Sequence, residues 1–308
     1  MQTLEKATSD QGEPFTISYA ITPEGQLKIQ KEMKLRREYA PKTPFILPLA
    51  DTIAVPHADF AVYKYWAGSL RSKYAPRWLS RPAIKQVARA ALEALRALHQ
   101  DGLVHTHVDV YAIKVRRGDG ELFKAVYLSN LNHVTHQDSE AARRGHPIGA
   151  RRGPRRSPEL LLGLPWGTST DIWSFGSLIL DLLLDYQLFD VFRQAATPED
   201  VTYPLAVFER MHKFFGPSPD ALQRMRPSGP GMPSAIASLA ACLDRYGPPK
   251  TPFHLVSERA VPRADNEFLR KIMVLNPAAR PTAEQLLDDE WWTEESQDTR
   301  DRDHGILS

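Results

Sequence analysis

Residues 155–183 read RRSPELLLGLPWGTSTDIWSFGSLILDLL, and this stretch decides the fold of the 308-residue chain. The longest apolar run of the chain begins in this stretch at Trp173, continues to Phe192 and contains aspartates at positions 181, 185 and 190. A membrane-spanning helix tolerates such carboxylates badly, so the pattern predicts a buried core helix. Asp171 lies near the start of that helix, where the helix dipole favours a negative charge.

The sequence on both sides of this stretch is mainly helical in pattern. Residues 82–100 carry apolar side chains at spacings of three and four, and Gly102 follows as a predicted C-terminal cap. Short apolar runs come next, and residues 137–156 lack periodicity and are predicted to be loop. Helix-like segments then dominate from Thr170 to Trp292.

The first part of the chain is predicted to be rich in strands. A turn-like stretch, residues 22–25, separates two apolar runs and favours a hairpin formed by residues 15–20 and 27–29. A helix is predicted from Lys31 to Tyr39. Two more strands are predicted, at residues 45–49 and 60–65. We therefore expect a flexible N-terminus (1–13), a small strand-rich lobe (14–66), a helical lobe (67–292) and a flexible tail (293–308).

The composition is that of an ordinary soluble globular protein, with 25% charged and 42% hydrophobic residues. Six Trp, ten Tyr and twelve Phe exclude disorder throughout the chain. The net charge of +2 offers no global polycation to nucleic acid or membrane. With one cysteine, Cys242, and no visible signal peptide, we expect an intracellular protein, cytoplasmic or nuclear.

Four stretches together resemble one known fold: residues 92–115, 126–134, 155–183 and 268–292. In order, residue type and spacing they are similar to the catalytic loop, the metal-binding loop and the flanking helices of eukaryotic protein kinases. The resemblance is strongest to a group of fungal serine/threonine kinase-like proteins, and it extends from about Ile29 to Trp292. It implies an α+β, two-lobed kinase-like fold with a reduced strand-rich N-lobe and a mainly helical C-lobe.

The resemblance assigns structural roles to several residues. Glu159, in Ser-Pro-Glu, matches the glutamate of the family's Ala-Pro-Glu motif, and Arg280 matches the arginine that pairs with it. Asp171 matches the aspartate that holds the backbone of the catalytic loop. His105 and Leu131 match two members of the family's regulatory hydrophobic spine.

The catalytic positions depart from the family pattern. Where kinases have His-Arg-Asp-x-Lys-x-x-Asn, residues 105–112 read HTHVDVYA. His107 therefore stands at the position of the base, Asp109 at that of the lysine, and Ala112 at that of the metal-binding asparagine. An alanine methyl cannot ligate Mg²⁺, which prefers oxygen, and imidazole replaces a carboxylate poorly beside a polyphosphate.

The nucleotide-binding positions depart as well. Asn130 replaces the metal-binding aspartate, while Asn132, at the glycine position, is a residue that tolerates left-handed backbone. Lys114 stands where the family has an aliphatic residue beneath the adenine ring. Glu32 is the best match to the glutamate of helix C, but no lysine partner can be assigned and no glycine-rich loop is present. The first strands are expected to be shortened or missing.

Three other interpretations of these residues stay open. His107 could act as a substitute base, and Asp109 could supply the missing carboxylate. A zinc site could use His105, His107, His133 and His136, although no recognised zinc motif is present. We predict no metal ligands and no cofactor, with ATP and Mg²⁺ required only if the protein is an active kinase.

The loop at residues 143–156 contains six arginines and no acid. They are Arg143, Arg144, Arg151, Arg152, Arg155 and Arg156. Such a loop is either a solvated, mobile segment or a guanidinium cluster that grips a phosphate or an acidic partner segment. Nucleic acid is disfavoured because aromatic residues are not interleaved with the arginines.

The sequence favours a pseudokinase, a kinase-like protein with weak or absent phosphotransfer that serves as a regulatory or binding scaffold. Its expected partner is a protein, acidic or phosphorylated, and no membrane is involved. The alternative is an active or weakly active ATP-dependent serine/threonine kinase with an atypical site. Whether the protein is an enzyme is left open at this stage.

Overall fold

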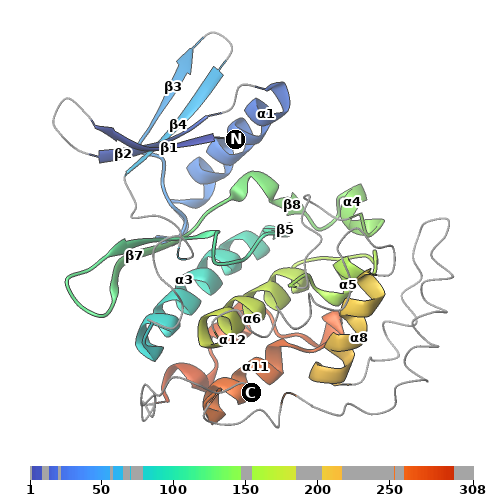
Figure 1. The fold of residues 1–308 in the computed structure, drawn as a ribbon. Coiled ribbons are helices and arrows are strands. Elements are labelled where there is room, and N and C mark those ends of the chain that lie inside the picture. The colour runs from blue at the N-terminus through green and yellow to red at the C-terminus, as the bar shows by residue number, and fades with distance from the viewer. Residues whose placement is uncertain are drawn as a thin grey trace.

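The computed structural model has two parts, a small sheet with one helix and a larger helical body below it (Figure 1). This arrangement confirms the predicted α+β, kinase-like fold. The structure describes residues 2–8, 14–19, 22–55, 58–64, 70, 79–146, 155–184, 203–216, 253 and 260–294. The predicted tail from residue 295 onward lies outside these residues, as do parts of both predicted lobes.

The upper part is a four-stranded antiparallel sheet in the order β1-β2-β4-β3. Its elements are β1 (Gln2–Thr8), β2 (Pro14–Tyr19), α1 (Pro23–Tyr39), β3 (Asp51–Val55) and β4 (Ala58–Lys64). Helix α1 packs on the sheet through Ile29 and Met33, which form a small core with Leu47 and with Ala61 of β4. The sheet therefore fixes one face of α1 and leaves the opposite face for the lower part.

Several strand predictions for the first part of the chain were wrong. Residues 27–29 belong to α1 and not to a hairpin, because Thr22 caps the helix by accepting a hydrogen bond from the Gly25 N–H, with Pro23 at the first turn. Residues 45–49 form no strand and make one isolated bridge, between Ile46 and Leu128. Strand β1 occupies most of the segment that was predicted to be flexible, because β2 provides it with a pairing partner.

The lower part contains the main hydrophobic core, into which α3 and α6 insert. Its elements are α3 (Arg81–His99), β5 (Leu103–Val104), β6 (Ile113–Arg117), β7 (Phe123–Leu128), η2 (Leu131–His133), β8 (Thr135–His136), α4 (Glu140–Arg143), α5 (Pro158–Leu161), α6 (Ser169–Leu184), α8 (Tyr203–Phe215), α11 (Arg263–Ile272), η4 (Pro277–Ala279), α12 (Ala283–Leu287) and η5 (Glu290–Trp292). The predicted helices at 82–100 and after Thr170 are confirmed, whereas α4 forms inside the segment predicted to be loop.

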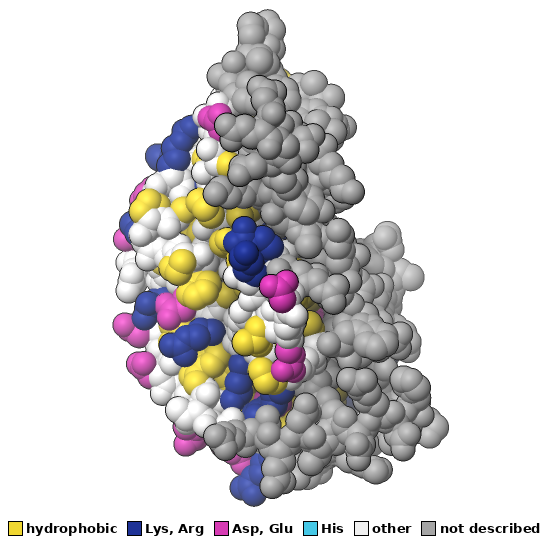
Figure 2. All heavy atoms as spheres, turned by 90° about the vertical axis from the view of Figure 1, so that its left-hand side faces the viewer, with side chains coloured by type: hydrophobic (Ala, Val, Ile, Leu, Met, Phe, Trp, Pro, Cys, Tyr) yellow, Lys and Arg dark blue, Asp and Glu magenta, His cyan; other side chains and the backbone are white. Residues whose placement is uncertain are grey.

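Helix α6 is the buried helix that the apolar run predicted. Trp173, Phe175 and Ile179 are fully buried on it, and Asp181 is buried as well. Within the described residues, no helix combines the length and the apolar character that crossing a bilayer requires. Figure 2 shows positive and negative side chains interspersed with hydrophobic ones over the described part of one face.

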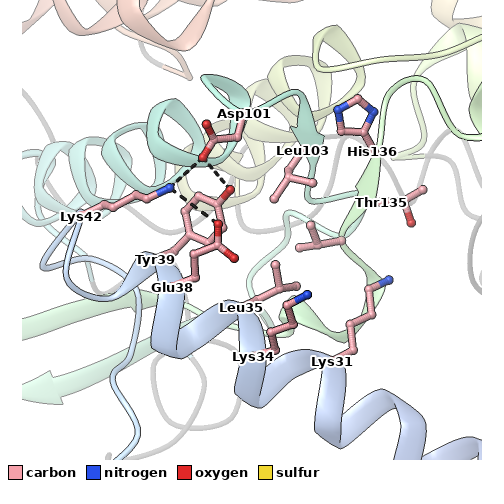
Figure 3. Close-up of a pocket in the computed structure, with 11 residues that line it drawn as sticks. Lys31, Lys34, Leu35, Glu38, Tyr39, Lys42, Asp101, Leu103, Thr135 and His136 are labelled. Atoms are coloured by element: carbon pink, nitrogen blue, oxygen red, sulfur yellow. Dashed lines mark hydrogen bonds and ion pairs between the residues drawn. The ribbon is translucent and has the colours of Figure 1, made fainter.

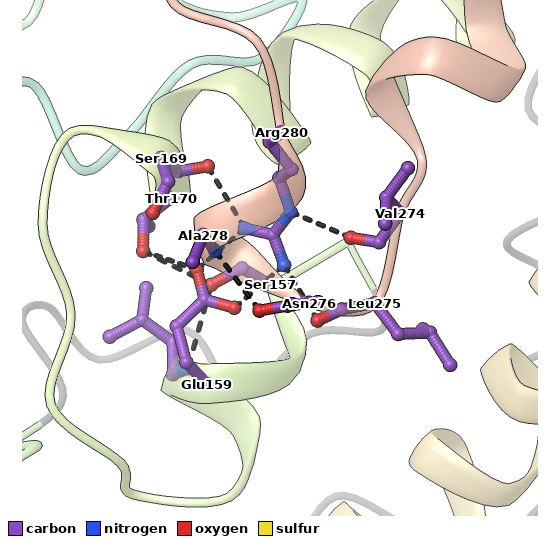
Figure 4. A network of polar contacts seen from close by, with 10 residues as sticks. Ser157, Glu159, Ser169, Thr170, Val274, Leu275, Asn276, Ala278 and Arg280 are labelled. Carbon is purple, nitrogen blue, oxygen red and sulfur yellow. Dashed lines mark hydrogen bonds and ion pairs between the residues drawn. The ribbon is translucent and has the colours of Figure 1, made fainter. Parts of the chain in front are cut away.

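A buried ion pair joins three segments of the lower part (Figure 4). Arg280 donates from Nη1 to Glu159 Oε1 at 2.7 Å and from Nη2 to Oε2 at 2.8 Å. Thr170, in α6, donates to the same carboxylate at 2.8 Å. Burial alone would raise the pKa of Glu159, but the guanidinium and its hydrogen bonds outweigh this and hold the pKa below its usual value.

Removal of Arg280 should therefore destabilise the protein strongly. We expect Arg280→Met to lower the free energy of unfolding by about 3–5 kcal/mol, because it leaves the Glu159 charge buried without a partner. Urea unfolding followed by circular dichroism measures this change. The exposed pair between Arg263 and Glu267 is the control, and Arg263→Met should cost less than about 1 kcal/mol. A loss at Arg280 no larger than that control would contradict the proposed role of the pair.

Candidate functional site

Asp171 holds the loop that carries the catalytic positions. Its carboxylate is fully buried at the start of α6 and accepts hydrogen bonds from the backbone N–H groups of His105, at 2.6 Å, and Thr106, at 2.8 Å. His99 Nε2 lies 3.0 Å from the same carboxylate. Thr106 has φ of 67°, a left-handed conformation that costs free energy for a β-branched residue. The two N–H bonds to Asp171 compensate for that strained turn.

His105 is a buried, neutral histidine. Its Nε2 lies 2.8 Å from the carbonyl oxygen of Ser129, and its Nδ1 accepts from the His107 backbone N–H at 3.3 Å. These partners require the proton to be on Nε2. Burial lowers the pKa of His105 to about 4, although the nearby charge of Asp171 opposes that shift. At neutral pH the ring is therefore a fixed hydrogen-bonding element between the two loops.

His107 lies at the surface of the loop beside Asp109. Its Nε2 is 3.4 Å from Asp109 Oδ2, and its ring stacks on that of His133 with centroids 5.6 Å apart. The other carboxylate oxygen, Asp109 Oδ1, accepts from the backbone N–H groups of Tyr111 and Ala112, both at 2.9 Å. Burial would raise the pKa of Asp109, but His107 and these N–H groups lower it overall. Asp109 thus stabilises the turn and orients His107.

The residues at the metal-binding positions do not fit Mg²⁺. Ala112 is fully buried and offers no side-chain oxygen, and its carbonyl accepts from the Ser129 N–H at 2.9 Å and hydroxyl at 2.8 Å. Asn130 offers only a neutral amide. The carboxylate of Asp109 is already engaged by the loop. In phosphoryl-transfer sites Mg²⁺ is bound by one or two carboxylates together with substrate phosphates, and neither Ala112 nor Asn130 offers a carboxylate.

The left-handed residue of the second loop is Asn130; Asn132, a residue type that tolerates this backbone, does not adopt it here. Asn130 has φ of 66° and precedes η2, so it makes the turn from β7 into that short helix. Leu131 follows it and is fully buried in the main core, and His105 is fully buried as well. The structure therefore places both predicted spine residues inside the molecule.

Glu32 is paired within its own helix. It is buried, and its Oε1 accepts from Arg36 Nη2 at 2.5 Å and Nε at 3.1 Å, while Arg36 Nη1 donates to the carbonyl oxygen of Leu47 at 2.6 Å. Strand β2, which precedes α1, contains no lysine. Sequence reasoning missed Arg36, although its spacing of four from Glu32 is that of a helical ion pair. Lys114 lies on β6 opposite Tyr127.

The four arginines of the loop that the structure describes have different surroundings. Arg155 forms a two-contact ion pair with the buried Asp181 of α6, at 2.6 and 2.9 Å. Arg143 and Arg144 are exposed, and Arg144 lies 3.1 Å from Glu140. Arg156 is partly buried. Arg151 and Arg152 lie outside the described residues.

The four histidines considered for zinc have other neighbours. His105 faces Ser129, His107 stacks on His133, and His136 lies 3.6 Å from Asp138. In the part of the chain that the structure describes, no group of three or more His, Cys, Asp or Glu side chains is placed to hold a metal ion.

Comparison with known proteins agrees with this geometry. The model of the protein kinase domain family matches residues 18–292. A serine/threonine protein kinase of Aspergillus fumigatus is 29% identical over 143 residues, which is 44% of this chain and 34% of that protein. Dual specificity tyrosine-phosphorylation-regulated kinase 2 of Drosophila melanogaster is 26% identical over 54% of this chain and 24% of its own length. Human serine/threonine-protein kinase PAK 4 is 30% identical over 34% of this chain and 17% of its own. The chain thus spans about a third or less of these relatives.

The low pKa of His105 should make folding stability depend on pH. The unfolded chain binds a proton near pH 6.5 and the folded chain only near 4, so stability falls as pH decreases through this window. The expected loss for this one group is on the order of 3 kcal/mol. Urea unfolding at pH 7, 6 and 5 measures the slope.

Two variants isolate this effect. His105→Phe should flatten the slope between pH 7 and 5, whatever its own stability at pH 7. His136→Gln changes an exposed histidine and should leave the slope as in the parent protein. An unchanged slope in His105→Phe would rule out His105 as its source.

Proposed function

Because the chain belongs to the protein kinase domain family, we propose that it is a catalytically impaired member that acts as a regulatory or binding scaffold. One observation carries the proposal: the two loops keep their backbone support from Asp171 and His105, while His107, Ala112 and Asn130 occupy the positions for base and metal ligands. The scaffold of the site is present without the charges that phosphoryl transfer requires.

The state of Glu32 supports the same proposal. In an active kinase this glutamate binds a lysine that contacts the nucleotide phosphates. Here the carboxylate of Glu32 is paired with Arg36, and strand β2 contains no lysine. Phosphoryl transfer depends almost entirely on positioning and charge stabilisation, so the loss of both the lysine and the metal ligands removes its main contributions.

A protein partner with acidic or phosphorylated segments suits this scaffold. Arg143 is exposed on α4, in the segment where kinases meet their substrates. Guanidinium groups bind carboxylate and phosphate in a two-contact geometry, so such an interaction should weaken as salt is raised.

An active kinase with an atypical site is the second candidate. The similar proteins are named as kinases, and His107 stands beside Asp109, which could orient an imidazole that accepts a proton. This candidate requires ATP and Mg²⁺ and predicts measurable turnover. The scaffold proposal does not.

One experiment separates the two candidates. The purified chain is incubated with ATP and Mg²⁺ and generic protein substrates, and phosphate transfer and thermal unfolding are both followed. We expect no transfer above the protein-free background and no increase in Tm that depends on Mg²⁺, because the ligands for the metal are missing. An active protein kinase in parallel reactions confirms that the assay works.

A positive result needs a matched control. Turnover that is lost in His107→Ala and retained in Lys124→Ala, an exposed change on β7, would overturn the scaffold proposal. Turnover that survives in both His107→Ala and Asp109→Asn would point to a contaminating kinase and leave the expected absence of activity intact.

A further inference from the structure

A pocket of about 620 Å³ lies between α1 and the turns of the lower part (Figure 3). One wall is the face of α1 that is turned away from the sheet, and the other comes from the segments around β5 and β8. The lining residues are Lys31, Lys34, Leu35, Glu38, Tyr39, Lys42, Asp101, Leu103, Val134, Thr135 and His136. None of residues 105–112 lines it, and only Val134, the last residue of the stretch 126–134, is shared with the kinase-like loops.

One end of the pocket carries uncompensated positive charge. Lys31 and Lys34 lie one turn apart on α1, and no hydrogen bond or ion pair joins either of them to an acid among the described residues. Both side chains are exposed at the mouth of the pocket, and the part of Lys31 that is buried lowers its pKa. The only acid between them in sequence, Glu32, is turned inward to Arg36. Glu38, one turn after Lys34, lies 3.8 Å from Lys42, so no acid of the described residues is paired with Lys31 or Lys34, and both ammonium groups can meet an anionic ligand.

The lysines elsewhere around the pocket are neutralised. Lys42 lies 2.7 Å from Asp101 and 3.8 Å from Glu38, and Lys28, one turn before Lys31, pairs with Glu24 at 2.6 Å. Tyr39 donates its hydroxyl to the same Asp101 carboxylate at 2.7 Å. At the far end of the pocket, the charged groups of Lys42, Asp101 and Glu38 are therefore paired with one another. The free positive charge is confined to one end.

The floor between the two ends is apolar. Leu35 and Val134 are buried, and Leu103 packs against the main core from a partly buried position. From Lys31 to Tyr39 the helix rises about 12 Å at 1.5 Å per residue. An extended peptide of about four residues covers that length at about 3.3 Å per residue.

We propose that this pocket is a docking site for an extended acidic peptide segment of a partner protein. A carboxylate or phosphate of the segment contacts Lys31 and Lys34, and a neighbouring apolar side chain packs on Leu35, Leu103 and Val134. A ligand that fits both the lysine end and the apolar floor carries an anionic group and an apolar group on one short chain. This inference does not depend on whether the kinase-like site is active.

A labelled peptide tests the proposal. Fluorescence anisotropy follows binding of fluorescein-labelled Gly-Glu-Glu-Leu-Gly to the full chain at low salt. We expect the variant with Lys31→Gln and Lys34→Gln to bind it about tenfold more weakly, or worse. The peptides Gly-Gln-Gln-Leu-Gly and Gly-Glu-Glu-Ser-Gly should also bind more weakly, because each removes one of the two contacts.

The matched control keeps the same change in net charge. Lys124→Gln with Arg270→Gln alters two exposed cations outside the pocket and should change affinity by less than about twofold. An equal loss in both double variants would mean non-specific attraction and would overturn the proposal. Absence of binding to the parent protein at millimolar peptide would overturn it as well.

Two small anions distinguish the source of the negative charge. Inorganic phosphate and acetate are added as competitors of the peptide. We expect neither to displace it at concentrations near that of the peptide, since each provides only one part of the contact. Displacement by either at such concentrations would identify a small-molecule anion site and contradict the assignment to a peptide.

Discussion

The start of helix α6 is the constraint on which the rest of the site depends. Asp171 there is fully buried and accepts hydrogen bonds from two successive N–H groups of the loop at residues 105–106. The residue before it, Thr170, donates to Glu159, which is paired with Arg280. Two neighbouring residues therefore connect the catalytic-type loop to the buried ion pair. Because a buried carboxylate without donors is costly, each group in this network requires the others.

The same network explains how the fold tolerates substitution at the reacting positions. The loop is held by backbone groups and by His105, and none of these contacts uses the side chain of His107, Ala112 or Asn130. Asp109 has taken a structural role instead, because its carboxylate caps the turn that leads to β6. Fold and phosphotransfer chemistry depend on different atoms. A kinase-like chain can therefore keep its fold after the residues for phosphotransfer have changed.

The sequence predicted those parts of the structure that follow from long periodic patterns. The stripe on residues 82–100 and the apolar run after Asp171 each bury one helix, and the pairing of Glu159 with Arg280 followed from the family resemblance. The start of α1 was missed because Thr22-Pro23 is both a turn signal and a helix start, and only tertiary contacts decide between them. The contact between Arg155 and Asp181 was missed because it joins a loop to a helix without any local pattern.

The pairing of charged side chains cannot be predicted from the amino-acid composition. The net charge of +2 is nearly neutral, yet its meaning depends on which side chains have neighbours of opposite sign. On α1, Lys28 meets Glu24 one turn away, whereas Glu32 turns inward to Arg36 and leaves Lys31 and Lys34 without an acid partner in the described part of the chain. The inward pair exists because Arg36 also reaches the carbonyl oxygen of Leu47, which fixes its orientation. The positive end of the pocket is thus a consequence of how the core holds one glutamate, and it follows from the packing of α1 and not from the number of lysines.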